Sequence, residues 1–148
     1  LLKVHLGAAI TAAITTLGVA GTSLVCSAGV GPADLPRWSM VAGILLFPIV
    51  VTTGTSGHFA SGGRLPPRIR AKRSRMPWIG GPTLFGIVPL GVIALKLASH
   101  ETLGWLAPAV HGFRGAVAIG VLTLMALSAR DGLALTLPRR RALARKRG

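Results

Sequence analysis

Acidic residues are almost absent from this sequence. Only three of its 148 residues are Asp or Glu, against 17 Lys and Arg, which gives a formal net charge of +14. The acids are Asp34, Glu101 and Asp131. Ion pairing on the surface is therefore scarce, and we expect the unpaired cations to meet anionic lipid headgroups or acidic partner subunits.

Cysteine is also rare. Cys26 stands alone in the chain, so neither an internal disulfide nor a cysteine-based metal cluster is expected. Glycine-rich phosphate loops, Ser/His/Asp sets and metalloprotease motifs are missing as well. The sequence favours a protein without catalytic activity, and we assign it no catalytic residue and no metal site.

Long apolar segments are what the chain has in abundance, since 51% of its residues are hydrophobic. A stretch of about 20 apolar residues is long enough to cross a bilayer as a helix. Four stretches meet this condition, at residues 4–30, 39–60, 79–99 and 110–137. We therefore predict an all-α polytopic membrane protein, an antiparallel bundle of four transmembrane helices that occupies residues 1–138.

The cations are clustered outside these segments. Twelve of the 17 lie in two runs, at residues 64–75 and 139–147. Loops rich in Lys and Arg stay on the side from which a membrane protein is inserted. Because two segments separate the runs, we expect both termini on the cytoplasmic or stromal side, with residues 139–148 as a basic C-terminal tail. The membrane is a bacterial plasma membrane, a thylakoid or an inner mitochondrial membrane.

A strongly basic chain also raises the question of nucleic-acid binding. Nucleic-acid binders carry Lys and Arg on the elements that face the phosphates and lack apolar runs of this length. We therefore expect no nucleic acid among the partners, and anionic lipids at the basic loop and tail instead.

Small residues recur along the first segment at steps of three and four, at Gly7, Thr11, Thr15, Gly18 and Thr22. This spacing places them on one face of a helix. In lipid such a face permits close contact with another helix. It offers more packing surface than four helices need among themselves, which favours other membrane subunits as partners.

Transport or proton pumping would need an ionisable group near the bilayer centre. We expect none, because all acids and cations fall at the ends of the predicted segments. Transport of a small molecule or lipid remains an alternative. It would require a polar cavity around two prolines and two threonines, at Pro48, Thr52, Thr53 and Pro89.

The four histidines have the strongest ligand potential. The predicted topology places His5 and His58 near the basic side, and His100 and His111 near the other side. Two pairs, one at each membrane face, could hold two b-type haems or ligate the magnesium of chlorophyll. Alternatively, all four are structural residues at the interface, and the pattern leaves both readings open.

Two helix openings carry a resemblance to a known family. The stretches Val4-His5-Leu6-Gly7 and Val110-His111-Gly-Phe-Arg-Gly115, with the pair Gly18 and Gly21, resemble the histidine-glycine openings of small four-helix membrane cytochromes of b type. They are also similar to an uncharacterised family of four-helix plastid and cyanobacterial membrane proteins. The resemblance covers two of the four segments and implies His5 and His111 as cofactor ligands. The second segment opens with Arg37-Trp38 instead of a histidine, so His58 and His100 depend on membrane depth alone.

Two functions follow from these patterns. The leading hypothesis is a small accessory subunit of a larger photosynthetic or respiratory membrane complex, with a structural or assembly role and a bound pigment or lipid. The alternative is a membrane cytochrome that transfers electrons across the bilayer between two haems.

Overall fold

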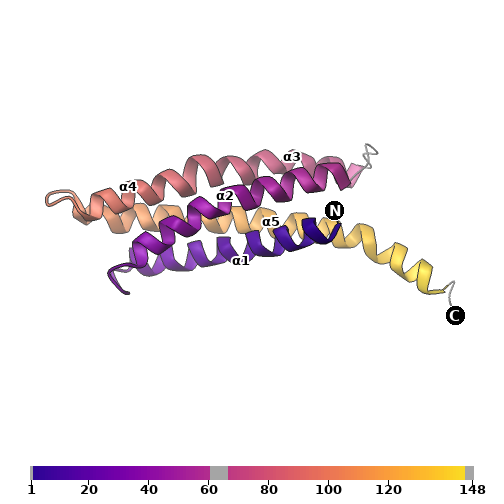
Figure 1. The fold of residues 1–148 in the computed structure, drawn as a ribbon, viewed down its shortest axis with the longest axis horizontal. Coiled ribbons are helices and arrows are strands. Elements are labelled where there is room, and N and C mark those ends of the chain that lie inside the picture. Colours follow the sequence, from indigo (N-terminus) through magenta and orange to yellow (C-terminus); the bar gives the residue numbers. More distant parts are fainter. Residues whose placement is uncertain (1, 61–66, 146–148) are drawn as a thin grey trace.

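The computed structural model describes residues 2–60 and 67–145, and side chains within residues 3–56, 59 and 74–131. Every regular element in these ranges is helical. The elements are α1 (Leu2–Ser27), α2 (Leu35–Ala60), α3 (Pro67–Pro82), the π-helical turn η1 (Thr83–Ile87), α4 (Val88–Ala98), the 3-10 turn η2 (Gly104–Leu106) and α5 (Ala107–Arg145). Helix α3, η1 and α4 follow one another directly and form a single rod (Figure 1).

The helices lie side by side as an antiparallel bundle (Figure 1). Among the described residues, α1 contacts α2 and α5, and the α3–η1–α4 rod contacts the same two helices, so α1 lies diagonally opposite that rod. Four stretches are long and apolar enough to cross a membrane: Lys3–Ser27, Leu35–Ser56, Ser74–Ala98 and Gly104–Asp131. The prediction of an all-α fold with four such helices is confirmed.

The two ends of the bundle differ. One end, here called the loop end, holds the connectors 28–34 and 99–106. The opposite end, here called the basic end, holds the start of α1, and α5 extends beyond the other helices there (Figure 1). Trp38 and Trp105 are exposed at the loop end, at 65% and 73%. Tryptophan is enriched at the interface between membrane and water.

Helix α1 ends three residues before the predicted boundary because the chain forms a Schellman motif. Gly29 adopts a left-handed conformation with φ 68°, which glycine reaches without steric cost. The amide of Val30 donates to Val25 O at 3.3 Å, and that of Gly29 donates to Cys26 O at 3.1 Å. These are the two backbone bonds that define the motif and close the last turn.

The two basic runs contain more helix than the sequence pattern indicated. Helix α3 begins at Pro67, inside the run 64–75, and α5 continues through most of the run 139–147 to Arg145. Proline is favoured at the first helical position because its missing amide would have no partner there. Residues 146–148 of the predicted tail lie outside the described residues.

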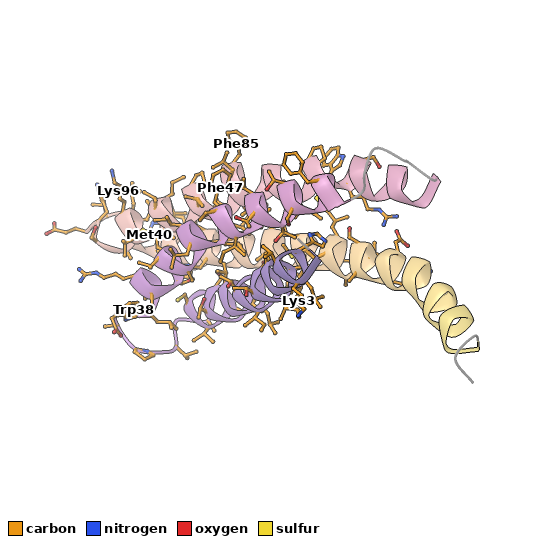
Figure 2. All side chains as sticks on the ribbon, turned by 45° about the vertical axis from the view of Figure 1, so that its right-hand side comes forward. Lys3, Trp38, Met40, Phe47, Phe85 and Lys96 are labelled. Atoms are coloured by element: carbon orange, nitrogen blue, oxygen red, sulfur yellow. The ribbon has the colours of Figure 1, made fainter. Side chains whose placement is uncertain are left out.

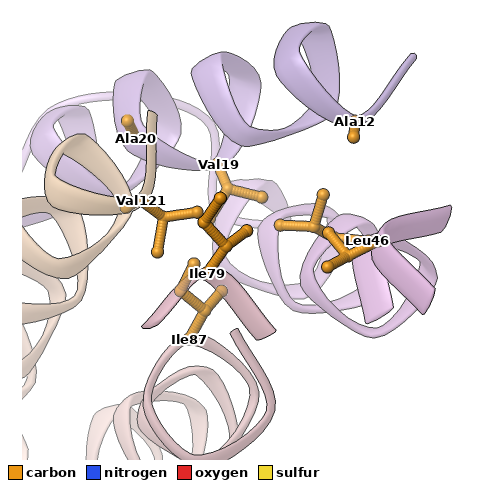
Figure 3. Close-up of a cluster of buried hydrophobic side chains, with 9 residues drawn as sticks. Ala12, Val19, Ala20, Leu46, Ile79, Ile87 and Val121 are labelled. Carbon is orange, nitrogen blue, oxygen red and sulfur yellow. The ribbon is translucent and has the colours of Figure 1, made fainter. Parts of the chain in front are cut away.

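The interior of the bundle is built from small and medium-sized residues. Val19, Leu46, Ile87 and Val121 are at most 1% exposed and lie at the centre (Figure 3). Large apolar side chains project outward instead, as Phe85 does at 79% exposure (Figure 2). An apolar surface of this extent suits a lipid environment, because soluble monomers rarely expose contiguous apolar patches of more than a few hundred Å².

Most of the small-residue face of α1 points away from the bundle. Gly7, Thr11 and Gly18 are exposed, and a Cβ atom at either glycine would meet nothing within 4 Å. A neighbouring face of α1 supplies the buried residues Ala12, Thr16, Val19, Ala20 and Ser23. The close-packing face predicted from the sequence is therefore open at Gly7, Thr11 and Gly18, whereas Thr22 at its end contacts α2 through a hydrogen bond to Ser39.

Substitutions of two adjacent leucines of α2 can test which face of this helix packs into the core. Leu46 is 0% exposed and Leu45 is 55% exposed. We expect Leu46→Ala to lower the free energy of unfolding by about 2 kcal/mol or more, because it leaves a cavity between helices. Leu45→Ala is the matched control and should cost clearly less. Reversible unfolding of the purified chain in detergent measures both, and equal losses would contradict this packing.

Candidate functional site

Arg114 is the largest fully buried side chain among the described residues, at 0% exposure. It lies on α5 seven residues after Ala107, about 10 Å along the helix axis. The sequence placed Arg114 near the start of the fourth apolar segment, and the structure adds that its side chain is enclosed by the bundle. Helix α5 begins three residues before the predicted segment at residue 110, and the side chain reaches across the bundle instead of turning back to the loop end.

The guanidinium of Arg114 donates hydrogen bonds to three other parts of the bundle. Its Nε donates to Ile87 O of η1 at 2.9 Å. On α2, Nη1 donates to Ser39 Oγ and Nη2 donates to Ser39 O, both at 2.7 Å. On α1, Ser23 Oγ lies 3.5 Å from Nη1. One side chain thus joins all four helical rods, since it connects α5 to the other three.

Ser39 is the centre of this network. Besides the two bonds from Arg114, its hydroxyl oxygen accepts a hydrogen bond from Thr22 Oγ1 at 2.8 Å. Thr22 belongs to α1, so the α1–α2 pair is fixed at the same level as the guanidinium. Ser39 is 1% exposed, and buried polar networks of this kind are stable only when their members are satisfied.

Two glycines make room for the guanidinium. A Cβ atom at Gly43 of α2 would lie 2.6 Å from Arg114 Nη2, and one at Gly91 of α4 would lie 3.1 Å from Arg114 Cζ. Both distances are closer than ordinary van der Waals contact. The glycines allow the backbones of α2 and α4 to approach the guanidinium closely.

The turn η1 positions one of the acceptors. It lies between Pro82, which ends α3, and Pro89, near the start of α4. Proline has no amide to donate, so it disturbs the regular helical bonding around it, and π-turns are frequent at functional sites. Ile87, the last residue of η1, is fully buried and presents its carbonyl to Arg114.

None of the three carboxylates of the chain pairs with Arg114. Asp34 accepts a hydrogen bond from Trp38 Nε1 at 3.0 Å, and Asp131 pairs with Arg75 at 2.6 Å. Glu101 is exposed in the connector between α4 and α5. The guanidinium is therefore held by neutral oxygens alone, and a buried cation without a counter-charge carries a desolvation cost of several kcal/mol.

His111 lies one turn before Arg114 on the inward face of α5. It is 3% exposed, and neither of its ring nitrogens has a hydrogen-bond partner among the described residues. Leaving a buried polar group without a hydrogen-bond partner costs about 1–3 kcal/mol of stability. The burial of His111 therefore destabilises the fold by about this amount.

The other histidines occupy different environments. The Nδ1 of His5 lies 3.0 Å from Thr53 O and 3.1 Å from Ser56 Oγ, where α1 contacts α2. His100 is exposed in the connector between α4 and α5, with Thr102 Oγ1 3.1 Å from its Nδ1. The side chain of His58 lies outside the described residues.

The structure places the two histidines of one predicted pair, His100 and His111, in different environments. His100 is at the surface, whereas His111 is enclosed by the bundle, and neither nitrogen of the His111 ring has accessible surface. A porphyrin needs a flat slot beside its ligand, so the residues around His111 do not fit a haem or chlorophyll. Ligation at His5 and His58 stays a prediction.

The residues considered for a transport cavity are not gathered in one place. Pro48 and Thr52 are exposed on α2, and the hydroxyls of Thr52 and Thr53 donate to Pro48 O and Ile49 O of their own helix, both at 2.8 Å. Pro89 lies on the neighbouring rod. Among the residues with described side chains, no group of three or more His, Cys, Asp or Glu could hold a metal ion.

Sequence reasoning missed the acceptors and glycines of the Arg114 network. The signal was present, because an arginine inside an apolar segment needs oxygen acceptors on neighbouring segments, and Ser23 and Ser39 flank the same short connector.

No family model matches the chain, and no curated protein or solved structure matches it.

A pair of glycine substitutions tests the network. Gly→Ala inside a helix normally adds up to about 1 kcal/mol of stability. At Gly43 the added methyl group would collide with Arg114 Nη2, so we expect Gly43→Ala to destabilise the protein. Gly21→Ala is the control, because a Cβ atom at Gly21 meets nothing within 4 Å. Thermal unfolding followed by circular dichroism measures both. A Gly43→Ala variant as stable as Gly21→Ala would contradict the described position of the guanidinium.

Proposed function

We propose that this protein is an integral membrane protein with four transmembrane helices that serves as a small accessory subunit of a larger membrane complex. The single observation that carries the proposal is the outward direction of Gly7, Thr11 and Gly18 on the small-residue face of α1. Such faces bring helices together in lipid, and a Cβ atom added at Gly7 or Gly18 would meet nothing within 4 Å.

The lengths of the four apolar stretches and the apolar surface of the bundle support membrane insertion. Each apolar stretch has 22 to 28 residues, whereas about 20 residues cross a hydrocarbon core of about 30 Å. Large apolar residues such as Ile14 and Leu17 are 65% and 60% exposed. In water this surface would drive aggregation, whereas in lipid it needs no cover.

The distribution of cations supports the orientation. The described parts of the two basic runs lie in α3 and α5 at the basic end (Figure 1). The exposed Lys3 and Arg130 lie there too. We propose that the basic end faces the cytoplasm, stroma or matrix and binds anionic lipid headgroups. The loop end, with its exposed Trp38 and Trp105, would then lie at the opposite surface of the membrane.

The residues on the outward face of α1 suit one kind of partner, a closely packed helix. Gly18 and Gly21 leave open space, and the hydroxyl of Thr11 donates to Gly7 O of its own helix at 3.0 Å. This face therefore presents little polarity and permits a close backbone approach. A transmembrane helix of another subunit fits it, and we propose that the complex is an energy-transducing one of photosynthetic or respiratory type.

The orientation can be tested by cysteine labelling in sealed membranes. In a Cys26→Ser background, we expect Glu101→Cys to react with a membrane-impermeant maleimide from one side and Arg130→Cys from the other. The two positions are exposed near opposite ends of the bundle. Reaction of both positions from the same compartment would contradict a transmembrane arrangement of α5.

Assembly can be tested by filling the open face of α1. We expect the double substitution Gly18→Leu and Gly21→Leu to release the chain from its complex, because two bulky side chains hold the partner helix away. Blue native electrophoresis of membranes from the natural source, with an epitope on the chain, measures the size of the complex.

Gly120→Leu is the matched control for that experiment, since Gly120 is also exposed with open space around it but lies on α5. The control should leave the complex intact. If the wild-type chain migrates as a free monomer, or if the α1 variant remains in the complex, the accessory-subunit proposal fails.

A further inference from the structure

We propose that the α3–η1–α4 rod is hinged at η1, so that α3 swings away from α5 when the ion pair between Arg75 and Asp131 opens. The swing would move the basic run at the start of α3, at the basic end of the bundle. This inference goes beyond the accessory role and does not depend on it, because it concerns a motion within the isolated chain. Four features of the described residues support it.

The first feature is the interrupted helical bonding at η1. The amide of Val88 donates to Thr83 O, which is a bond of a π-helix and not of an α-helix. Pro82 ends α3 and Pro89 lies in the first turn of α4, and neither residue has an amide to donate. Sharp bends in helices occur at prolines and at π-turns. The stretch between the two prolines is therefore where the rod bends.

The second feature is the firm attachment of the rod on the loop side of η1. Ile87 O accepts the hydrogen bond from Arg114 Nε at 2.9 Å. Gly91 of α4 lies against the guanidinium, since a Cβ atom there would be 3.1 Å from Arg114 Cζ. Ala94 is 0% exposed. Helix α4 is thus held by buried contacts with α2 and α5.

The third feature is the weaker attachment on the other side of η1. Among the described side chains of α3, Ile79 is the buried apolar one, at 5% exposure. A Cβ atom at Gly80 or Gly81 would meet nothing within 4 Å, so these positions contribute no side-chain packing. A second attachment is the ion pair, in which Arg75 Nη1 lies 2.6 Å from Asp131 Oδ2 of α5.

The fourth feature is the exposure of this ion pair. The side chains of Arg75 and Asp131 are 31% and 29% exposed. Ion pairs that water reaches are weak, and salt screens them. Arg75 precedes Thr83, the first residue of η1, by about 12 Å of helix. A bend of about 20° at η1 would therefore move Arg75 by roughly 4 Å, which is enough to open the pair.

Distances between two spin labels, measured by double electron–electron resonance, test the hinge on the full chain in a non-ionic detergent. In a Cys26→Ser background, the first pair is attached at Leu6→Cys on α1 and Ser74→Cys on α3. The second pair, at Leu17→Cys on α1 and Ile93→Cys on α4, is the control. The four labelled positions are exposed, so the labels should not disturb the core.

We expect Asp131→Asn, which removes the charge and keeps the shape, to shift or broaden the α1–α3 distances by roughly 4 Å. The α1–α4 distances should stay as they are, because α4 is held by Arg114. Glu101→Gln is the matched control variant and should change neither pair, since Glu101 is exposed in the connector between α4 and α5. Exchange of the two charges, in Arg75→Asp with Asp131→Arg, should restore the wild-type distances.

Salt provides the same test without a substitution in the ion pair, and it serves if Asp131→Asn does not fold. In about 1 M KCl the Debye length falls to about 3 Å, so we expect the α1–α3 distances of the otherwise unaltered chain to change as they do in Asp131→Asn. The Asp131→Asn variant should no longer respond to salt.

Three results would overturn the proposal. If the α1–α3 distances stay unchanged in Asp131→Asn and in concentrated KCl, packing and not the ion pair holds α3. If the α1–α3 and α1–α4 distances change together, the whole rod moves and the hinge is not at η1. If Glu101→Gln has as large an effect as Asp131→Asn, the change reflects the net charge of the chain and not this ion pair.

Discussion

The bundle depends on one interaction, the hydrogen bonds from the guanidinium of Arg114 to neutral oxygens on three neighbouring helices. Ionised side chains are expensive inside hydrocarbon, and they persist there only where other groups replace the lost water. Here Ser39 supplies both its hydroxyl and its carbonyl, and Ile87 supplies a carbonyl from a π-turn. The glycines at 43 and 91 follow from the same requirement, since a methyl group at either position would press against the guanidinium.

The distribution of side chains is otherwise the reverse of that in a soluble bundle. The interior holds small hydroxyl residues such as Thr16, Ser23 and Thr83, each fully buried, whereas phenylalanine and tryptophan cover the outside (Figure 2). In lipid, burial of a large apolar residue gains little, and close packing with hydrogen bonds between helices supplies the stability. The exposed glycines on the small-residue face of α1 are of the kind that permit such close packing, and the proposal of a partner helix is based on them.

Much of this architecture could be predicted from the sequence. The number of helices followed from the length of the apolar runs, because only helices and closed barrels satisfy the backbone in lipid. The direction of a helix face could not be predicted, since the small residues of α1 and its buried face at Ala12 and Val19 have similar spacing. The Arg114 network was missed for a related reason. Its depth was judged from a predicted segment start at residue 110, whereas the helix begins at Ala107 and the side chain reaches inward. Likewise, depth alone placed His100 and His111 together, although one is exposed and the other is enclosed.

The central claim is that Arg114 is enclosed between the helices, and nitrogen-15 NMR of the arginine side chains tests it most directly. In the purified chain we predict one Nε–H resonance that exchanges slowly with water and shows close contacts to Ser39 and Ile87, and that disappears in Arg114→Lys. If every arginine Nε–H exchanged at the rate of a solvent-exposed side chain, Arg114 would be hydrated, and this account of the bundle would be contradicted.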